Sequence, residues 1–484
     1  MNWKVISRNV GYALLVNALF MFISILVSVF GGNDSALAAM IISFTITFIV
    51  GVFPLIFVRK TTAISLKEGY VIIVLAWLLS FIVGMLPYAL WGGPFTLQNA
   101  WFESVSGYTT CGATILQSVE SLPKSLLFWR SSTHFIGGLG VVVFLLLIIP
   151  ESSPMRLRLT NMELTSLSKT GYASRSSRTV IIFASVYVSL FVLATLCYAL
   201  LGMPIFDAVC HAMSVASTGG FSTRNLSIAA FDSRWIEGVT MLFMYLSSLH
   251  FGLIYVTVVT RSLKPLNNPV VKVFTFTILA VALVLGSWMM ISGTSDNWFE
   301  AIWGSLFHTI STVTTTGFAI MDNHDWSAWV MILLSLAGIV SGCAGSTTGG
   351  LKVDRALLLA KSAGNYVNNI LHPSSVNEIR FGKKIIQSED VAPHLIYIGL
   401  YFFCLMLSIL LSAATGVDHL NAVAASVATL SNIGPACAEM GTMGSFADIP
   451  AMTKLLYSFN MFVGRIEIYP VLAVLGMMLD KRNK

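Results

Sequence analysis

The chain has 484 residues, of which 56% are hydrophobic and 10% are charged, and its mean hydropathy is +0.81. A water-soluble protein could not bury this much apolar surface, so the composition excludes that class. The net charge of +6 comes from basic loops on one side of a membrane and predicts no nucleic-acid partner. We therefore expect an all-α polytopic membrane protein.

The first two apolar stretches, near residues 10–30 and 37–58, form one predicted unit. The first imitates a cleaved signal peptide, because small residues follow it at 36–38. A second full-length span comes at once, however. We therefore expect an uncleaved N-terminal transmembrane hairpin over residues 1–66.

Eight further apolar stretches follow, each long enough for the ~30 Å hydrocarbon core of a bilayer. They lie near residues 69–91, 126–149, 179–201, 235–260, 270–291, 326–359, 392–414 and 452–478. Basic residues gather on one side of the alternating loops, which predicts that both termini are cytoplasmic. The opposite side is acidic, and an acidic outer mouth would concentrate cations.

Four short stretches rich in Ser, Thr and Gly lie between these spans and are too polar to cross a membrane. They align without gaps when four glycines coincide: Gly112, Gly220, Gly317 and Gly434. Three positions earlier stand hydroxyl residues, Thr109, Ser217, Thr314 and Ser431. Two positions earlier stand small polar residues, Thr110, Thr218, Thr315 and Asn432. This self-similarity is typical of an internally repeated transporter or channel.

Each repeat is thus predicted to be a span, a pore helix, a polar filter loop and a second span, with all four repeats around one pore. The predicted pore repeats cover residues 67–175, 176–265, 266–385 and 386–484. Irregular backbone at membrane depth survives only where it lines a watery path or is buried in protein. The alternative is that the small residues merely allow membrane helices to pack closely.

The residue types of the four loops fit ion coordination by backbone carbonyl groups. Glycine reaches conformations closed to other residues, so neighbouring carbonyls can turn inward and replace the water shell of an ion. The negative C-terminal ends of the pore helices would favour a cation. An intramembrane enzyme and a non-conducting receptor or scaffold are the alternatives of other classes.

The four units behind an extra hairpin resemble the Trk/Ktr/HKT superfamily of K⁺ transport proteins, most closely its TrkH-type bacterial members. The resemblance covers essentially the whole chain. It implies a K⁺ uptake protein of the bacterial inner membrane with a gated, channel-like pore, no enzymatic activity and no bound cofactor. Related plant proteins with serine at the position of Gly112 prefer Na⁺, so this glycine favours K⁺. A Na⁺-transporting or Na⁺-coupled relative of the same fold is the alternative.

The same resemblance makes the four loops a selectivity filter. The segments that would coordinate K⁺ are Thr109, Thr110, Cys111 and Gly112; Ser217, Thr218, Gly219 and Gly220; Thr314, Thr315, Thr316 and Gly317; and Ser431, Asn432, Ile433 and Gly434. The fourth segment departs furthest from the others, because it has Asn432, Ile433 and Pro435 where the second and third loops have Thr, then Gly or Thr, and Phe after the aligned glycine.

The span after the third loop contains a stretch at residues 338–350 that is too rich in Gly, Ser and Thr for an ordinary membrane helix. We expect this stretch to unwind just below the filter. TrkH-type proteins use such a loop as their gate, which implies a gate at Gly342, Gly345, Ser346, Thr347, Thr348, Gly349 and Gly350. The alternative is a close helix crossing through its glycines.

The last span contains Arg465 and Glu467, and a charge that faced lipid there would be costly. The resemblance makes Arg465 a positive barrier under the filter. The alternative is a structural pair with Glu467 or another buried acid. Structural roles are expected for the other intramembrane candidates, Arg130, His134, His211 and His308.

The chain leaves too few residues outside the membrane for a nucleotide-binding domain of its own. The resemblance implies a separate cytosolic ring of TrkA-type nucleotide-binding subunits, docked on basic loops around residues 150–178 and 352–389. It also implies a homodimer within the lipid bilayer. The six cysteines contain no CxxC pair, so neither a disulfide framework nor a zinc site is predicted.

Overall fold

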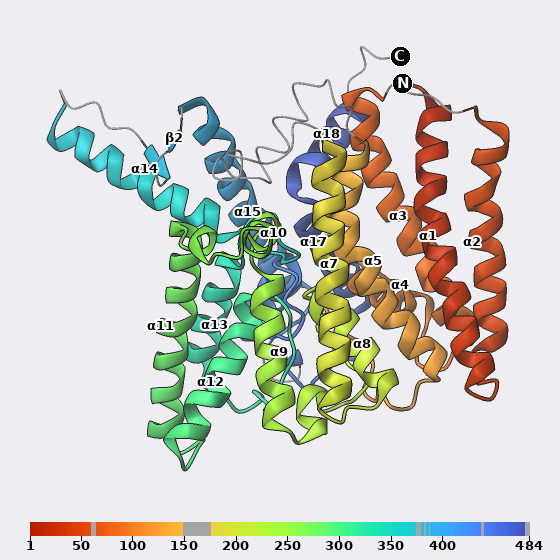
Figure 1. Cartoon of the computed structure of the whole chain (residues 1–484), viewed down its shortest axis with the longest axis horizontal. Helices are drawn as coiled ribbons and strands as arrows, with labels where there is room; N and C mark the ends of the chain where they lie inside the picture. Colours follow the sequence, from red (N-terminus) through yellow and green to blue (C-terminus); the bar gives the residue numbers. More distant parts are fainter. Residues whose placement is uncertain are drawn as a thin grey trace.

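The structure, a computed structural model, describes residues 1–59, 64–148, 176–373, 379–381, 384–386, 388–436 and 440–479. Within these ranges the chain is a bundle of helices, and the strands that it forms are β1 (Ile379–Phe381) and β2 (Lys384–Ile386), which pair antiparallel. The N-terminus and α18 (Ile468–Leu479), the last helix of the described residues, lie at the same end of the bundle (Figure 1). The predicted all-α fold is confirmed.

A helical hairpin precedes four units that share one order of elements. The hairpin consists of α1 (Trp3–Phe30) and α2 (Leu37–Phe57). The first unit consists of α3 (Leu66–Trp91), α4 (Leu97–Tyr108) and α5 (Lys124–Ile148). The second consists of α7 (Ser176–Leu200), α8 (Ile205–Ala216), η1 (Ser227–Phe231), α9 (Arg234–Ser247), α10 (Phe251–Thr260) and η2 (Lys264–Leu266). The third consists of α11 (Pro269–Ile291), α12 (Trp298–Val313), α13 (Ala328–Val340) and α14 (Val353–Leu371). The fourth consists of α15 (Ser388–Ala414), α16 (His419–Leu430), α17 (Ala451–Ile466) and α18 (Ile468–Leu479).

The hairpin is joined firmly to the first unit, at one edge of the bundle (Figure 1). Its two helices approach closely at glycines, since a Cβ on Gly11 would lie 2.7 Å from the carbonyl oxygen of Gly51. At the tip, the Asp34 carboxylate accepts hydrogen bonds from the N–H and the hydroxyl of Ser125, both at 2.9 Å. Because α1 also packs against α3 and α5, the hairpin is packed onto the bundle rather than being a detached anchor.

The stretches predicted as spans at 235–260 and 452–478 are each divided into two helices by a sharp bend. The helix axis bends by 103° between α9 and α10 and by 106° between α17 and α18. At the first bend, the side chain of His250 accepts a hydrogen bond from the N–H of Gly252 at 3.0 Å and so caps α10. At the second, Glu467 has a φ of +67°, which interrupts a right-handed helix. Each bend thus depends on one polar residue inside an apolar stretch.

Among the described residues, six helices are individually long and apolar enough to span a membrane, and the two bent pairs raise the number to eight. Of the other two predicted spans, the one at 126–149 reaches the limit of the described residues. The one at 326–359 is split into α13 and α14 by non-helical residues, and this confirms the predicted unwinding. Beyond the split, α14 leaves the bundle at the upper left of the view (Figure 1).

Candidate functional site

Four loops follow the pore helices α4, α8, α12 and α16 and share one backbone path. The C-cap of each helix is the aligned hydroxyl residue: Thr109, Ser217, Thr314 or Ser431. The next residue has a φ between 52° and 55°, and the aligned glycine has a φ between 81° and 95°. The residue just before each glycine donates its N–H to a carbonyl five residues earlier, at 2.8–3.0 Å. The sequence alignment therefore corresponds to one local structure used four times.

The four loops close into a ring in chain order. A Cβ on Gly112 would overlap the carbonyl oxygen of Gly219, and one on Gly220 would overlap that of Thr316. Likewise, a Cβ on Gly317 of the third loop would overlap the carbonyl oxygen of Ile433 in the fourth. A Cβ on Gly434 of the fourth loop would overlap the carbonyl oxygen of Cys111 in the first. Glycine is therefore required at these positions by the space available as well as by the left-handed φ.

Each oxygen at these contacts belongs to the residue that precedes the next aligned glycine. These residues are buried, and their carbonyl oxygens accept no hydrogen bond from any described residue: Cys111, Gly219, Thr316 and Ile433. Buried carbonyl groups normally have partners, so four unbonded ones in a ring are unusual. A dehydrated monovalent cation would satisfy all four.

A non-helical loop between α13 and α14, which we call the gate loop (residues 341–352), lies against three of the four filter loops. The N–H of Gly349 donates to the hydroxyl of Thr315 at 2.9 Å, in the third loop. The hydroxyls of Thr347 and Thr218 lie 3.4 Å apart, at the second loop. A Cβ on Gly349 would overlap the carbonyl oxygen of Ser431, in the fourth. The segment predicted to be a gate thus packs directly against the filter loops.

Two positively charged side chains donate hydrogen bonds to carbonyl groups of the gate loop. One guanidinium nitrogen of buried Arg465 donates to the Thr347 carbonyl at 2.6 Å, and the other donates to the Gly137 carbonyl at 3.3 Å. The ammonium group of Lys352 donates to the carbonyl and, at 2.9 Å, to the hydroxyl of Thr348. The loop is therefore held by one positively charged side chain of α17 and by one of its own.

The pairing of Arg465 with Glu467, raised as an alternative from the sequence, does not occur. Glu467 instead accepts from Arg355 at 2.8 Å and 2.9 Å, and the Arg355 guanidinium lies 3.9 Å from the centre of the Tyr397 ring. Arg465 forms no ion pair with a described acidic residue. Its charge is therefore balanced only by carbonyl dipoles.

Comparison with known proteins decides the family. The family described as "TrkH: Cation transport protein" matches residues 36–483. The chain belongs to the TrkH family. Its resemblance to this family, inferred from the repeated loops, is confirmed. The family is one of transport proteins rather than enzymes, and with its apolar helices the chain is a multi-pass membrane protein.

Individual TrkH-family relatives match over nearly all of the chain. It is 32% identical to the Trk system potassium uptake protein TrkG of Escherichia coli (strain K12), over 97% of each chain. It is 32% identical to the Trk system potassium uptake protein TrkH of Salmonella typhimurium, over 86% of each. The crystal structure of the potassium transporter TrkH from Vibrio parahaemolyticus aligns with a TM-score of 0.88 at 28% identity, over 100% of this chain and 99% of that one.

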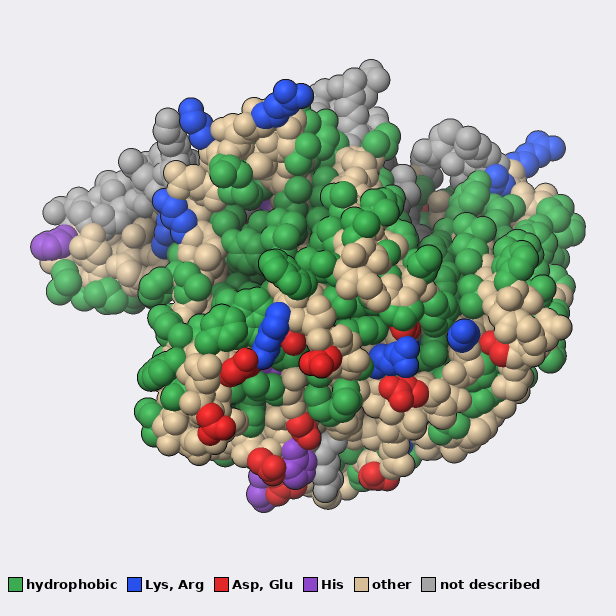
Figure 2. Space-filling view, turned by 60° about the horizontal axis from the view of Figure 1, so that its bottom comes forward, with side chains coloured by type: hydrophobic (Ala, Val, Ile, Leu, Met, Phe, Trp, Pro, Cys, Tyr) green, Lys and Arg blue, Asp and Glu red, His purple; other side chains and the backbone are tan. Residues whose placement is uncertain are grey.

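A vestibule opens on the other side of the ring from the gate loop of this TrkH-family chain. It is a hollow of about 70 Å³ whose lining includes Gly112, Gly220, Gly317 and Arg130. Arg130 is neutralised by Glu103 at 2.7 Å and lies 3.8 Å from the centre of the Phe221 ring, which supports a structural role. Figure 2 shows red acidic side chains gathered across the face turned toward the viewer, with few blue ones among them. This face fits the acidic mouth expected from the sequence.

The fourth filter loop departs from the others in its side-chain contacts. The hydroxyl of Ser431 lies 2.7 Å from that of Tyr401, on α15. The amide of Asn432, oriented so that each atom has a partner, donates to the Met461 carbonyl and accepts from the Arg465 N–H, both at 3.2 Å. Asparagine at this position thus ties the fourth loop to the helix that carries the buried arginine.

Three histidines predicted to be structural lie within the packed interior. The ring of His134 stacks on Phe221 with centroids 4.0 Å apart, and its Nδ1 lies 3.0 Å from the Ser214 hydroxyl. Both ring nitrogens of His211 have partners at 2.8 Å. His308 packs against Trp326. No described group of three or more His, Cys, Asp or Glu residues could hold a metal ion.

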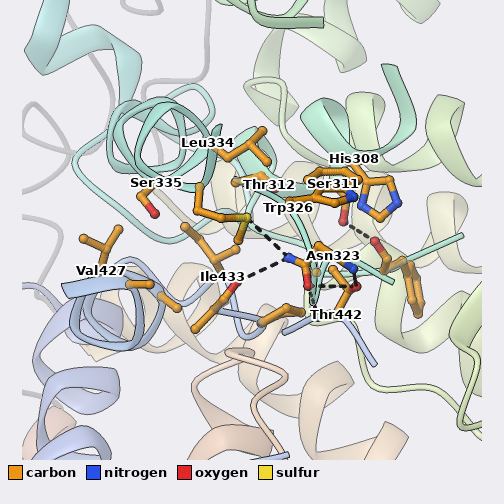
Figure 3. A pocket seen from close by; sticks show the side chains of 17 residues that line it. His308, Ser311, Thr312, Asn323, Trp326, Leu334, Ser335, Val427, Ile433 and Thr442 are labelled. Carbon is orange, nitrogen blue, oxygen red and sulfur yellow. Dashed lines mark hydrogen bonds between the residues drawn. The ribbon is translucent and has the colours of Figure 1, made fainter. Parts of the chain in front are cut away.

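A side cavity of about 30 Å³ lies behind the fourth filter loop, between the third and fourth units. Figure 3 shows Asn323 at its centre, within reach of Thr442 and near Ile433. Asn323 accepts from the Thr442 N–H at 2.8 Å and donates to the Ala436 carbonyl at 3.4 Å. A space of this size and polarity suits a single water molecule.

His250 is a neighbour of the gate loop that the sequence did not predict. It lies at the bend between α9 and α10, and a Cβ on Gly345 of the gate loop would lie 2.6 Å from its ring. The N–H of Phe251 donates to the Gly345 carbonyl at 3.1 Å. A histidine inside an apolar run was the available signal, but the run was interpreted as one continuous helix.

Proposed function

We propose that this TrkH-family protein takes up potassium across the bacterial inner membrane through a pore whose selectivity filter is the four-loop ring. The ring of buried carbonyl oxygens without hydrogen bonds carries this proposal, because a dehydrated cation needs such ligands. The names of the relatives, potassium uptake proteins and a potassium transporter, support the choice of ion. The coordinating residues are the four filter segments named from the sequence.

Substituting serine for Gly112 tests the filter. A Cβ there would overlap the Gly219 carbonyl oxygen, and the φ of +83° strains any side chain. The serine hydroxyl could replace a displaced carbonyl as an ion ligand, so we expect conduction to survive. The ratio of K⁺ to Na⁺ flux should fall about fivefold, which corresponds to the low end of the ~1–3 kcal/mol of local backbone strain.

Flux of K⁺, Rb⁺ and Na⁺ into liposomes that contain the purified protein measures this ratio. Gly92→Ser is the matched control, because Gly92 has a φ of +81° in the same unit but no atom within 4 Å of its added Cβ. It should leave the ratio unchanged. An unaltered ratio in Gly112→Ser would contradict the assignment of the filter.

Sodium is the alternative ion, for a Na⁺-transporting or Na⁺-coupled relative of the same fold. The same liposomes distinguish the two. If the protein conducts K⁺, an excess of Na⁺ should reduce the K⁺ flux only slightly. If it transports Na⁺, an excess of K⁺ should reduce the Na⁺ flux only slightly.

We propose that the gate loop closes the pore below the filter and that the structure represents this closed state. The gate residues are Gly342, Gly345, Ser346, Thr347, Thr348, Gly349 and Gly350, with Arg465 as a positive barrier beside them. The contacts of the loop with three filter loops and with Arg465 and Lys352 support this proposal.

Thr315→Val is expected to increase K⁺ leak through the closed pore by about fivefold. The change removes the hydroxyl that accepts from the Gly349 N–H, and a buried hydrogen bond contributes about 1 kcal/mol. Flux into liposomes without any cytosolic partner measures the leak. Thr309→Val is the control, because the buried hydroxyl of Thr309 has no partner among the described residues. Equal leak in both variants would count against a gate held closed by this bond.

Regulation is proposed to come from a cytosolic TrkA-type ring of nucleotide-binding subunits, since the relatives are named as parts of a Trk system. Residues 149–175, which include most of the first predicted docking loop, lie outside the described residues. The second docking segment, at 352–389, includes α14. We also propose a homodimer, and both termini in the cytoplasm, because the N-terminus and α18 lie at one end of the bundle (Figure 1). The domain limits predicted from the sequence are kept as the proposed organisation.

A further inference from the structure

The N-terminal hairpin has no counterpart in the four repeats, yet it contains a polar residue deep in its first helix. Asn17 lies at the middle of α1, and only 1% of its side chain is exposed. A polar group buried at membrane depth is costly unless it is hydrogen-bonded, and such residues usually have a function.

The Asn17 amide connects the hairpin to the first repeat. Its nitrogen donates to the hydroxyl of Ser80, on α3, at 2.9 Å. Its oxygen accepts from the hydroxyl of Tyr108, the last residue of the pore helix α4, also at 2.9 Å. Tyr108 immediately precedes Thr109, where the first filter segment begins. One side chain of the hairpin thus reaches the start of the first filter loop through a single buried hydroxyl.

The surroundings of Tyr108 leave its ring little freedom. A Cβ on Gly84 of α3 would overlap the ring, and a Cβ on Gly137 of α5 would overlap the Tyr108 carbonyl oxygen. The tyrosine is therefore enclosed by α3 and α5, and Asn17 fixes its polar end. Gly137 also provides the carbonyl to which Arg465 donates, so this site lies next to the gate region.

The first filter loop is the only one of the four with this arrangement. The residues that correspond to Tyr108 in the other loops carry no hydroxyl: Ala216, Val313 and Leu430. Among the described residues, the gate loop contacts the second, third and fourth loops. The first loop is thus held from the hairpin side, and the other three from the gate side.

We propose that Asn17, through Tyr108, is a positioning residue for the selectivity filter, so that the N-terminal hairpin sets K⁺ over Na⁺ preference by fixing the first loop. The first loop contacts two other loops of the ring: Gly112 packs on Gly219 of the second loop, and Cys111 packs on Gly434 of the fourth. A shift of the first loop therefore widens the ring at two contacts. This inference rests on the proposed filter function.

The test compares the K⁺ to Na⁺ flux ratio of full-length variants in liposomes. Tyr108→Phe removes one oxygen atom and should lower the ratio about fivefold, as expected for a lost buried hydrogen bond of about 1 kcal/mol. Asn17→Leu should lower it similarly, and the double variant should be no worse than either single variant, because both act through one bond. Total K⁺ flux and the midpoint of thermal unfolding of Tyr108→Phe should stay close to those of the wild type.

Tyr88→Phe is the matched control. Tyr88 is a fully buried tyrosine of the same repeat whose hydroxyl has no partner among the described residues, so its loss should leave the ratio unchanged. If Asn17→Leu does not fold, Ser80→Ala replaces it, because it loosens the same amide from its other side.

The experiment distinguishes a failure of the positioning role from a failure of the proposed filter function. An unchanged ratio in Tyr108→Phe, in an assay where Gly112→Ser lowers it, would overturn the positioning role and leave the filter intact. If the flux ratio fell as much in Tyr88→Phe as in Tyr108→Phe, the positioning role would also be overturned, because the loss of any buried tyrosine hydroxyl would then lower the ratio. A wild-type protein without K⁺ preference would instead overturn the proposed function itself.

Discussion

Replacing Gly220 by alanine is expected to reduce K⁺ flux at least about a hundredfold, which corresponds to roughly 3 kcal/mol. Two effects combine at this position. The added Cβ would overlap the Thr316 carbonyl oxygen, and the φ of +81° is unfavourable for alanine. The methyl group offers no oxygen in place of the displaced carbonyl, unlike the serine of Gly112→Ser. The ring therefore loses a ligand as well as its geometry.

Gly202→Ala separates the two effects. Gly202 precedes the pore helix of the same unit and has a φ of +93°, but no atom lies within 4 Å of its added Cβ. We expect a stability loss of about 1 kcal/mol and normal flux. Flux into liposomes and thermal unfolding in detergent measure both quantities. A Gly220→Ala protein that folds and conducts normally would rule out this glycine as part of the pathway.

Replacing Arg465 by glutamine is expected to raise K⁺ flux at least about tenfold. Two unit charges about 8 Å apart repel by roughly 2 kcal/mol at an effective dielectric constant of about 20, and this repulsion would disappear for an ion below the filter. Glutamine keeps an N–H donor but is shorter than arginine, so the change removes the charge and also weakens the contacts with the Thr347 and Gly137 carbonyls.

Arg465→Lys is the companion variant, because it keeps the charge in the same place. Its flux should remain near that of the wild type, and single-channel or liposome flux measurements give the comparison. If lysine and glutamine raise flux equally, the loss of the second contact, with the Gly137 carbonyl, explains the effect and the charge does not. Reduced flux with a lowered unfolding midpoint in both variants would support a purely structural arginine.

The repeated loops could be predicted from sequence because their geometry leaves local marks. A left-handed φ beside a neighbouring backbone requires glycine, as at Gly112 and Gly317, and small hydroxyl residues end the pore helices. The unwound gate loop was predictable for the same reason, since its glycines and hydroxyl residues cannot form an apolar span. These features depend on a few consecutive residues.

The partners of charged residues could not be predicted, because they depend on distant parts of the chain. Arg355 and Glu467 are separated by 112 positions, and nothing near either residue indicates the other. The bends before His250 and at Glu467 were missed because apolar residues continue on both sides and hide a change of direction. Asn17 was overlooked for a similar reason, although a single asparagine in an apolar helix is itself a signal.

Under the proposed function, the direct contact of the gate loop with the filter loops links ion binding and gate movement thermodynamically. The hydroxyl of Thr315 is shared by the filter and the Gly349 N–H, so a change at one alters the free energy of the other. Any ion that binds the ring more tightly when the gate loop is withdrawn must, to the same degree, favour its withdrawal. The transported ion is then also an effector of its own passage, and the ion composition outside the cell sets part of the opening equilibrium.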